Sequence, residues 1–128
     1  MRPIEFRGMR MGGKGWAFGS IIVENGCAEI VDNNPDTYPR FILRQVDPES
    51  IGQFTGMTDR NGVKIFEGDI VRWIYKPMPF KDTWKEYTLT VQYDEGRFFA
   101  AGGTVDADLY CNTDDMEVIG NAYEGVRK

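Results

Sequence analysis

The sequence predicts an all-β protein with little helix, folded as a barrel or as a pair of curled antiparallel sheets. Short segments rich in β-branched and aromatic residues recur at intervals of about 8 to 12 residues, which is typical of β-sandwiches and barrels. No long stretch places apolar residues at the i, i+3, i+4, i+7 spacing of an amphipathic helix. The 15 glycines and 6 prolines among 128 residues indicate a chain with many turns.

The first predicted hairpin turns at Asn25-Gly26. Both central residues of a type I′ turn need a positive φ, and Asn-Gly is the pair that adopts it most readily. The turn joins predicted strands at 20–24 and 27–31. A further strand is expected at 38–46, followed by one helical turn at 47–50, where Pro48 suits the first helical position.

Segment 69–76 is rich in β-branched and aromatic residues and predicts another strand. In 85–94, apolar and polar residues alternate with the period of a half-buried strand. A two-residue turn, Glu95-Gly96, then leads into 98–101 as a second hairpin. The segments expected to be loops are 32–39, 77–83 and 101–115.

The length suits a single domain covering residues 1–128. A boundary between two subdomains is expected near 47–54, where the strand pattern lapses and Pro and Gly cluster.

The composition excludes several classes of enzyme and scaffold. The chain has no histidine, which excludes Ser-His-Asp and Cys-His nucleophile pairs and most catalytic zinc sites. Its two cysteines, Cys27 and Cys111, are too few for a four-thiolate site or a disulfide scaffold. We therefore expect free thiols, packed as small apolar side chains in a core.

The start of the chain lacks the apolar run of a signal peptide, and no segment is apolar enough to span a bilayer. The expectation is a soluble protein of a reducing cytoplasm with no membrane partner.

Acidic residues are concentrated in the second half of the chain. Residues 1–64 carry eight basic and eight acidic side chains, whereas 65–128 carry seven basic and twelve acidic ones, for a net charge of -5. This balance argues against nonspecific coating of DNA or of an anionic membrane. Two local basic segments remain, at 1–14 and 60–85.

The acidic segment from Asp106 partly matches the spacing of an EF-hand calcium loop. With Asp106 at position 1, three other acids fall on EF-hand ligand positions 3, 9 and 12, but position 6 is Cys111 instead of glycine. A solvated acidic loop is preferred, and whether the set binds a cation stays open. The set comprises Asp106, Asp108, Asp114 and Glu117.

Aromatic and basic residues alternate on the predicted strand 69–76 and continue into the loop after it. Such an arrangement could stack bases or a proline-rich ligand beside positive charge. The competing interpretation, which is favoured, places Trp73 and Tyr75 in the core, because they share one face of the strand and a barrel of this size needs large side chains inside. The candidate interaction surface consists of Arg72, Trp73, Tyr75, Lys76 and Phe80.

Three segments carry a family resemblance. Residues 51–71 read IGQFTGMTDRNGVKIFEGDIV, residues 117–124 read EVIGNAYE, and residues 2–7 read RPIEFR. The first of these closely resembles the signature of the YopX family, small proteins found in phages and prophages. The other two resemble the end and the start of that family's sequences, so the three segments follow the family's order along the chain. The resemblance implies coiled antiparallel sheets with an SH3-like barrel over about 55–124, and an oligomer. It implies no activity, catalytic residue, cofactor or metal.

The glycines of these motifs have a physical interpretation. Gly62 would supply a positive φ in the turn that begins at Asp59, and Gly68 a tight turn before the strand at 70–75. Gly120 would mark a bulge or a close backbone approach. The polar residues expected to stabilise turns by hydrogen bonds are Gln53, Thr55, Asp59, Asn61 and Glu67.

The leading functional hypothesis is a non-catalytic phage or prophage protein that acts through protein contacts, as a homo-oligomer with an unidentified host or phage protein. The alternative is nucleic-acid binding through the basic segment 60–85. A hydrolase that uses paired carboxylates is the least favoured, because the acids lie scattered over predicted turns.

Overall fold

The computed structural model describes residues 4–32 and 42–126. The chain divides into two compact units, Met1–Phe54 and Thr55–Lys128. This division falls at the end of segment 47–54, where the sequence places its boundary. The predicted all-β class is confirmed, because the described residues form antiparallel strands with a single short α-helix.

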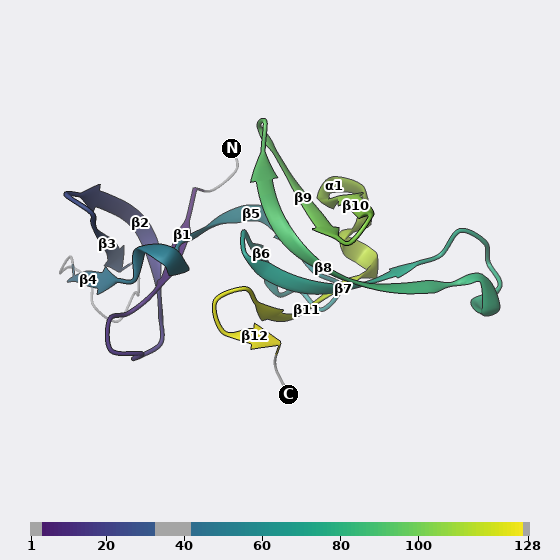
Figure 1. Ribbon diagram of the computed structural model, residues 1–128, viewed down its shortest axis with the longest axis horizontal. Coiled ribbons are helices and arrows are strands. Elements are labelled where there is room, and N and C mark those ends of the chain that lie inside the picture. Colours follow the sequence, from purple (N-terminus) through teal and green to yellow (C-terminus); the bar gives the residue numbers. More distant parts are fainter. Residues whose placement is uncertain (1–3, 33–41, 127–128) are drawn as a thin grey trace. The chain divides into compact units, whose positions relative to one another are not determined.

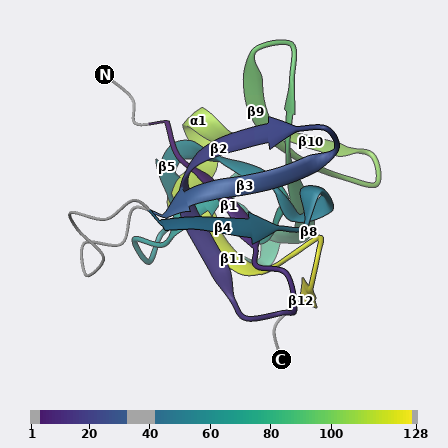
Figure 2. The same ribbon diagram turned by 90° about the vertical axis from the view of Figure 1, so that its left-hand side faces the viewer.

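The first unit is one antiparallel sheet with strand order β4-β3-β2-β1-β5. Figure 2 shows β2, β3 and β4 lying side by side in it. The final strand continues past Phe54 into the second unit. The strands are β1 (Phe6–Met9), β2 (Trp16–Glu24), β3 (Cys27–Asp32), β4 (Ile42–Val46) and β5 (Gly52–Thr58).

The Asn25-Gly26 hairpin is confirmed. Asn25 and Gly26 have φ values of 52° and 79°, as a type I′ turn requires. The turn sets Glu24 opposite Cys27 and so fixes the β2–β3 register. This register buries the small core of the unit, which consists of Ala17, Ala28, Ile30 and Val46 with Ile51 against it.

Strand β4 is joined back to the end of β1, so the sheet curls. Arg10 forms a bridge to Val46, and Asp47 N donates to Met9 O at 2.9 Å. The close approach needs a glycine in β1, because a Cβ on Gly8 would lie 2.8 Å from Val46 Cγ2. The predicted helical turn is also present, as the 3-10 helix Pro48–Ser50 capped by Asp47.

The second unit contains a sheet with strand order β10-β9-β8-β7-β11-β12, and β6 pairs with β5. The pairings among the described residues end at β10 and β12, so the SH3-like barrel stays a prediction. The strands are β6 (Lys64–Phe66), β7 (Asp69–Tyr75), β8 (Lys85–Asp94), β9 (Arg97–Gly102), β10 (Val105–Asp108), β11 (Met116–Asn121) and β12 (Gly125–Val126).

The alternating pattern of 85–94 is confirmed at its centre. Leu89 and Val91 are buried on one face of β8, and Tyr93, at the end of the strand, is exposed but lies against Phe98 with ring centroids 5.0 Å apart. The second hairpin also has the expected turn, with φ values of 50° at Glu95 and 81° at Gly96. The buried core is Ile65, Val71, Trp73, Leu89, Val91, Phe98, Ala100, Ala107, Leu109 and Met116.

Two predictions were wrong. Segment 101–115, expected to be a loop, contains β10, α1 (Leu109–Asn112) and the 3-10 helix Thr113–Asp115. The ladder between β10 and β9 specifies this strand. Its four residues, VDAD, do alternate, but the segment is very short and aspartate is unfavourable in strands. The cysteines do not pack in a core, because Cys27 follows a hairpin turn and Cys111 lies on the outer side of α1, and both are exposed.

Gly120 lies at a bulge and at a close backbone approach, as the sequence predicts. The register between β11 and β7 shifts between Val118 and Gly120. A Cβ on Gly120 would lie 2.2 Å from Gly125 O and 2.7 Å from Val126 Cα. Only glycine therefore allows β12 to fold back against β11.

Among the helices in the described part of the chain, none has the length and apolar character needed to cross a bilayer.

Replacing Gly120 by alanine should destabilise the second unit by about 3 kcal/mol, because backbone atoms must move to admit the methyl group. Gly96→Ala is the matched control, since its Cβ would meet nothing within 4 Å and only its φ of +81° is unfavourable, at a cost of about 1 kcal/mol. Urea unfolding of both variants measures the difference. Equal losses would show that β12 does not hold this position in solution.

Candidate functional site

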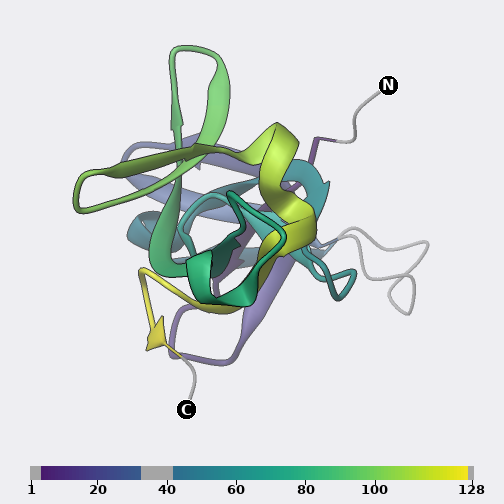
Figure 3. The same ribbon diagram turned by 90° about the vertical axis from the view of Figure 1, so that its right-hand side faces the viewer.

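The candidate surface predicted from the sequence lies on β7 and on the hairpin loop that follows it. In Figure 1, β7 and β8 extend away from the rest of their unit as a long two-stranded arm. Figure 3 views this arm from its end, where the 3-10 helix Lys81–Thr83 lies. We call residues 76–84 the arm tip.

Trp73 belongs to the core and anchors the arm. It is buried among the core residues, and its ring centroid lies 5.3 Å from that of Tyr75 and 5.7 Å from that of Tyr87. Tyr87 faces Trp73 across the β7–β8 ladder. The preferred interpretation as core is confirmed for Trp73 and wrong for Tyr75, which is 42% exposed because the arm extends beyond the core at this point.

The arm tip is held by its own hydrogen bonds. Trp84 Nε1 donates to Met78 O at 2.9 Å, and Thr83 Oγ1 donates to Phe80 O at 2.7 Å. Lys76 Nζ lies 4.7 Å from the centroid of the Trp84 ring, within the range of a cation–π interaction. The turn therefore has a defined shape, although most of it faces solvent.

Two apolar side chains project from this turn. Met78 is 52% exposed and Phe80 is 62% exposed. Exposed apolar side chains are common singly, but these two lie within three residues on a turn fixed by the bonds above. The tip thus presents a small apolar surface beside the exposed Lys81 and Lys85.

Carboxylates of the same unit neutralise much of the basic segment 60–85. Glu117 Oε2 accepts from Arg60 Nη2 at 3.0 Å and from Arg72 Nη2 at 2.5 Å. Arg72 also lies 3.5 Å from Glu86, and Lys76 lies 3.0 Å from Asp115. Of the cations in the predicted surface, both Arg72 and Lys76 are therefore in ion pairs.

The four acids tested as a calcium loop have separate roles. Asp106 pairs with Arg97 at 3.5 Å, Asp108 accepts from Tyr110 N at the start of α1, and Glu117 holds the two arginines. Asp114 is exposed on the adjoining 3-10 helix. In the parts of the chain that the structure describes, no three His, Cys, Asp or Glu residues are placed to share a metal ion.

The carboxylates of the family-like signature bind backbone amides. Asp59 Oδ1 accepts from Asn61 N at 2.8 Å and from Val63 N at 2.9 Å, and its Oδ2 accepts from Val118 N at 2.9 Å. Asp69 Oδ2 accepts from Phe66 N at 2.7 Å. Both carboxylates are buried. They stabilise turns, because their oxygens accept hydrogen bonds from backbone N–H groups of the same chain.

Thr55 has the turn-stabilising role that the sequence predicts. Its hydroxyl donates to Ile65 O at 2.8 Å and accepts from Met57 N at 3.2 Å.

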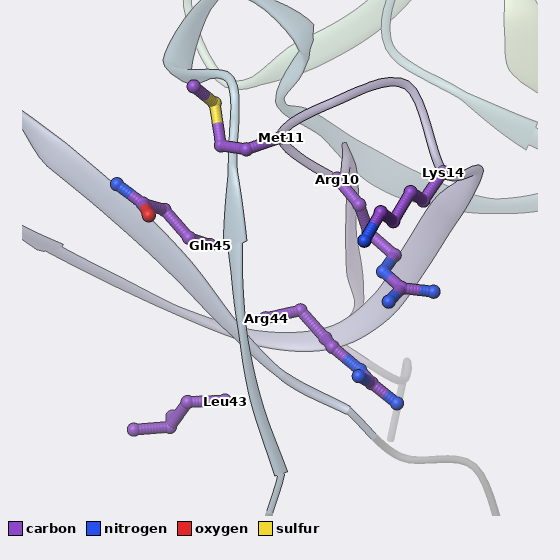
Figure 4. Close-up of a pocket in the computed structure, with 6 residues that line it drawn as sticks. All are labelled: Arg10, Met11, Lys14, Leu43, Arg44 and Gln45. Atoms are coloured by element: carbon purple, nitrogen blue, oxygen red, sulfur yellow. The ribbon is translucent and has the colours of Figure 1, made fainter.

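A second candidate site lies entirely in the first unit. A hollow of about 280 Å³ is lined by Arg10, Met11, Lys14, Leu43, Arg44 and Gln45. Figure 4 shows the charged ends of Arg10, Lys14 and Arg44 on one side of β4, and Met11, Leu43 and Gln45 on the other. The sequence marks Arg10 and Lys14 as part of a basic segment but misses Arg44, which lies 30 positions further along the chain.

The chain is similar to a known protein family and to solved structures. The family model described as YopX protein matches residues 17–127. A solved structure, that of protein EF1440 from Enterococcus faecalis, is similar with a TM-score of 0.55 and 22% identity, over 97% of this chain and 96% of that chain. At this identity the likeness concerns the fold alone. Among curated proteins no match is found.

Replacing Asp59 by alanine should cost about 3 kcal/mol or more, because three backbone N–H groups lose their acceptor. Asp59→Asn should lose less, since its carbonyl oxygen can still accept from Asn61 N and Val63 N while its amide cannot accept from Val118 N. Urea unfolding is the measurement, with the exposed Asp114→Ala as control. A loss in Asp59→Ala no larger than in the control would contradict the structural role.

Proposed function

The chain belongs to the YopX protein family, and on this premise we propose that it is a non-catalytic binding protein that assembles with copies of itself and with a protein partner. We further propose a phage or prophage origin and action in the host cytoplasm, which the resemblance of the sequence motifs to the YopX signature supports. The observation that carries the proposal is the ordered arm tip with its exposed Met78 and Phe80.

A second copy of the same chain has chemistry that suits this tip. Besides its apolar side chains, the tip region carries Lys81 and Lys85, which have no carboxylate partner among the described residues. Residues 94–124 carry eight carboxylates against the single Arg97. Opposite charges on two surfaces of one chain favour association of like copies.

In the proposed contact, the arm tip of one copy docks on the surface around α1 of a second copy. Tyr110 on α1 is 83% exposed, and Asp108 and Asp114 lie on either side of that helix. An aromatic side chain flanked by acids complements an apolar tip flanked by lysines. Because the two surfaces differ, the contact between copies is head-to-tail. Such a contact gives a closed oligomer only if the copies form a ring.

Nucleic-acid binding through segment 60–85 is the weaker alternative. Binding of a polyanion depends on cations available to phosphates, and Arg60, Arg72 and Lys76 already lie against carboxylates. Lys81 and Lys85 alone would provide a small electrostatic contribution.

Light scattering coupled to size exclusion tests the assembly. We expect the native chain to exceed the monomer mass, and Met78→Gln with Phe80→Gln to shift it to the monomer, because the apolar contact is lost. Val23→Gln is the control, since Val23 is 65% exposed on the first unit and should leave the mass unchanged. A native chain that is monomeric at every concentration would overturn the proposal.

Charge reversal tests the choice of surface. Lys81→Glu should weaken the oligomer at least tenfold in dissociation constant, and Asp114→Lys in the same chain should restore it, since the pair of charges is then exchanged. Analytical ultracentrifugation at low and high salt provides the constants. If Asp114→Lys does not rescue Lys81→Glu, the tip does not dock at α1.

A further inference from the structure

The hollow of the first unit brings together three cations from two separate segments. Arg10 and Lys14 belong to the connection between β1 and β2, and Arg44 belongs to β4. Like charges repel, so this grouping does not stabilise the fold by itself.

Backbone hydrogen bonds fix the position of these cations. Met11 N donates to Gln45 O at 3.0 Å, and Arg10 N donates to Gly15 O at 2.9 Å. The bridge from Arg10 to Val46 holds the same connection on the outer edge of β4. The backbone that carries Arg10 is therefore held against β4, the strand that carries Arg44.

Their charge is only partly neutralised by the protein. Arg44 Nε lies 3.3 Å from Asp32 Oδ2. In the described part of the chain, Arg10 and Lys14 have no carboxylate partner. The cations of the second unit differ in this respect, since Glu117 alone binds both Arg60 and Arg72.

We propose that this hollow binds the phosphate group of a small ligand. Arginine guanidinium groups match the oxygens of a phosphate in bidentate geometry, and lysine adds a point charge. The volume of about 280 Å³ lies near the lower end of small-ligand sites, which begin at roughly 300 Å³. Met11 and Leu43 line the hollow from the other side of β4 (Figure 4), so the cations hold the ligand by its phosphate.

Isothermal titration calorimetry of the full chain tests the site with four probes: inorganic phosphate, AMP, ATP and a ten-nucleotide single-stranded DNA. We expect saturable binding of AMP or ATP that weakens as salt increases. Arg10→Gln with Lys14→Gln should weaken it at least tenfold. The matched control is Lys64→Gln with Arg97→Gln, which removes two exposed cations of the second unit, changes the net charge equally and should bind as the native chain does.

The relative affinities of the four probes show whether the hollow binds phosphate. Tighter binding of ATP or AMP than of inorganic phosphate supports a nucleotide-sized site, and binding of inorganic phosphate with equal affinity supports recognition of the phosphate alone at the same place. Equal weakening by both double variants would overturn the proposal, because net charge would then explain the binding. Binding of the DNA alone, or of no probe by a native chain with an intact far-ultraviolet spectrum, would overturn it as well.

Discussion

The Asp59 carboxylate is the interaction on which the second unit most depends. It accepts hydrogen bonds from Asn61 N and Val63 N in its own turn, and from Val118 N in β11, 59 residues away. A buried carboxylate is costly unless its oxygens are satisfied, and here three backbone donors satisfy it. The same bonds fix the turn between β5 and β6 and attach it to the closing strand, so a signature motif and the end of the chain become one structural element.

The position of β11 also determines which basic side chains of the second unit are in ion pairs. Once β11 is held beside β7, Glu117 lies opposite Arg72 in the ladder and within reach of Arg60. Basic charge that the sequence places in 60–85 is therefore offset inside the unit. Met78 and Phe80 remain exposed on the arm tip, next to Lys81, Asp82 and Lys85. In the first unit, by contrast, Arg10 and Lys14 retain their charge beside a hollow.

The proposed contacts of the protein thus differ in chemistry between the units. A fixed turn with exposed Met78 and Phe80 suits a protein surface, whereas the grouped cations of the hollow suit a phosphate. Neither surface uses the buried carboxylates of the signature, Asp59 and Asp69, which are occupied by backbone amides. The residues that carry the family resemblance are accordingly those that build the fold.

The sequence by itself determined the local structure. Asn25-Gly26 and Glu95-Gly96 set two hairpins because each turn needs positive φ at both residues. Alternation placed Leu89 and Val91 in the core, and Gly120 marked the bulge. Of the candidate surface, the sequence found Tyr75 and Phe80 but did not separate them from the buried Trp73, since a strand pattern shows which residues share a face and not where that face leaves the core. Strand β10 was missed because its pairing with β9, and not its own four residues, makes it a strand.

Tertiary structure alone decided which charges are neutralised and which gather. Arg60 and Arg72 meet Glu117, and Arg10 and Lys14 meet Arg44, through strand pairings between segments 30 to 57 residues apart. No local period encodes such pairings, because backbone hydrogen bonds are the same for every residue. Their register is fixed only when the buried side chains of both strands pack together.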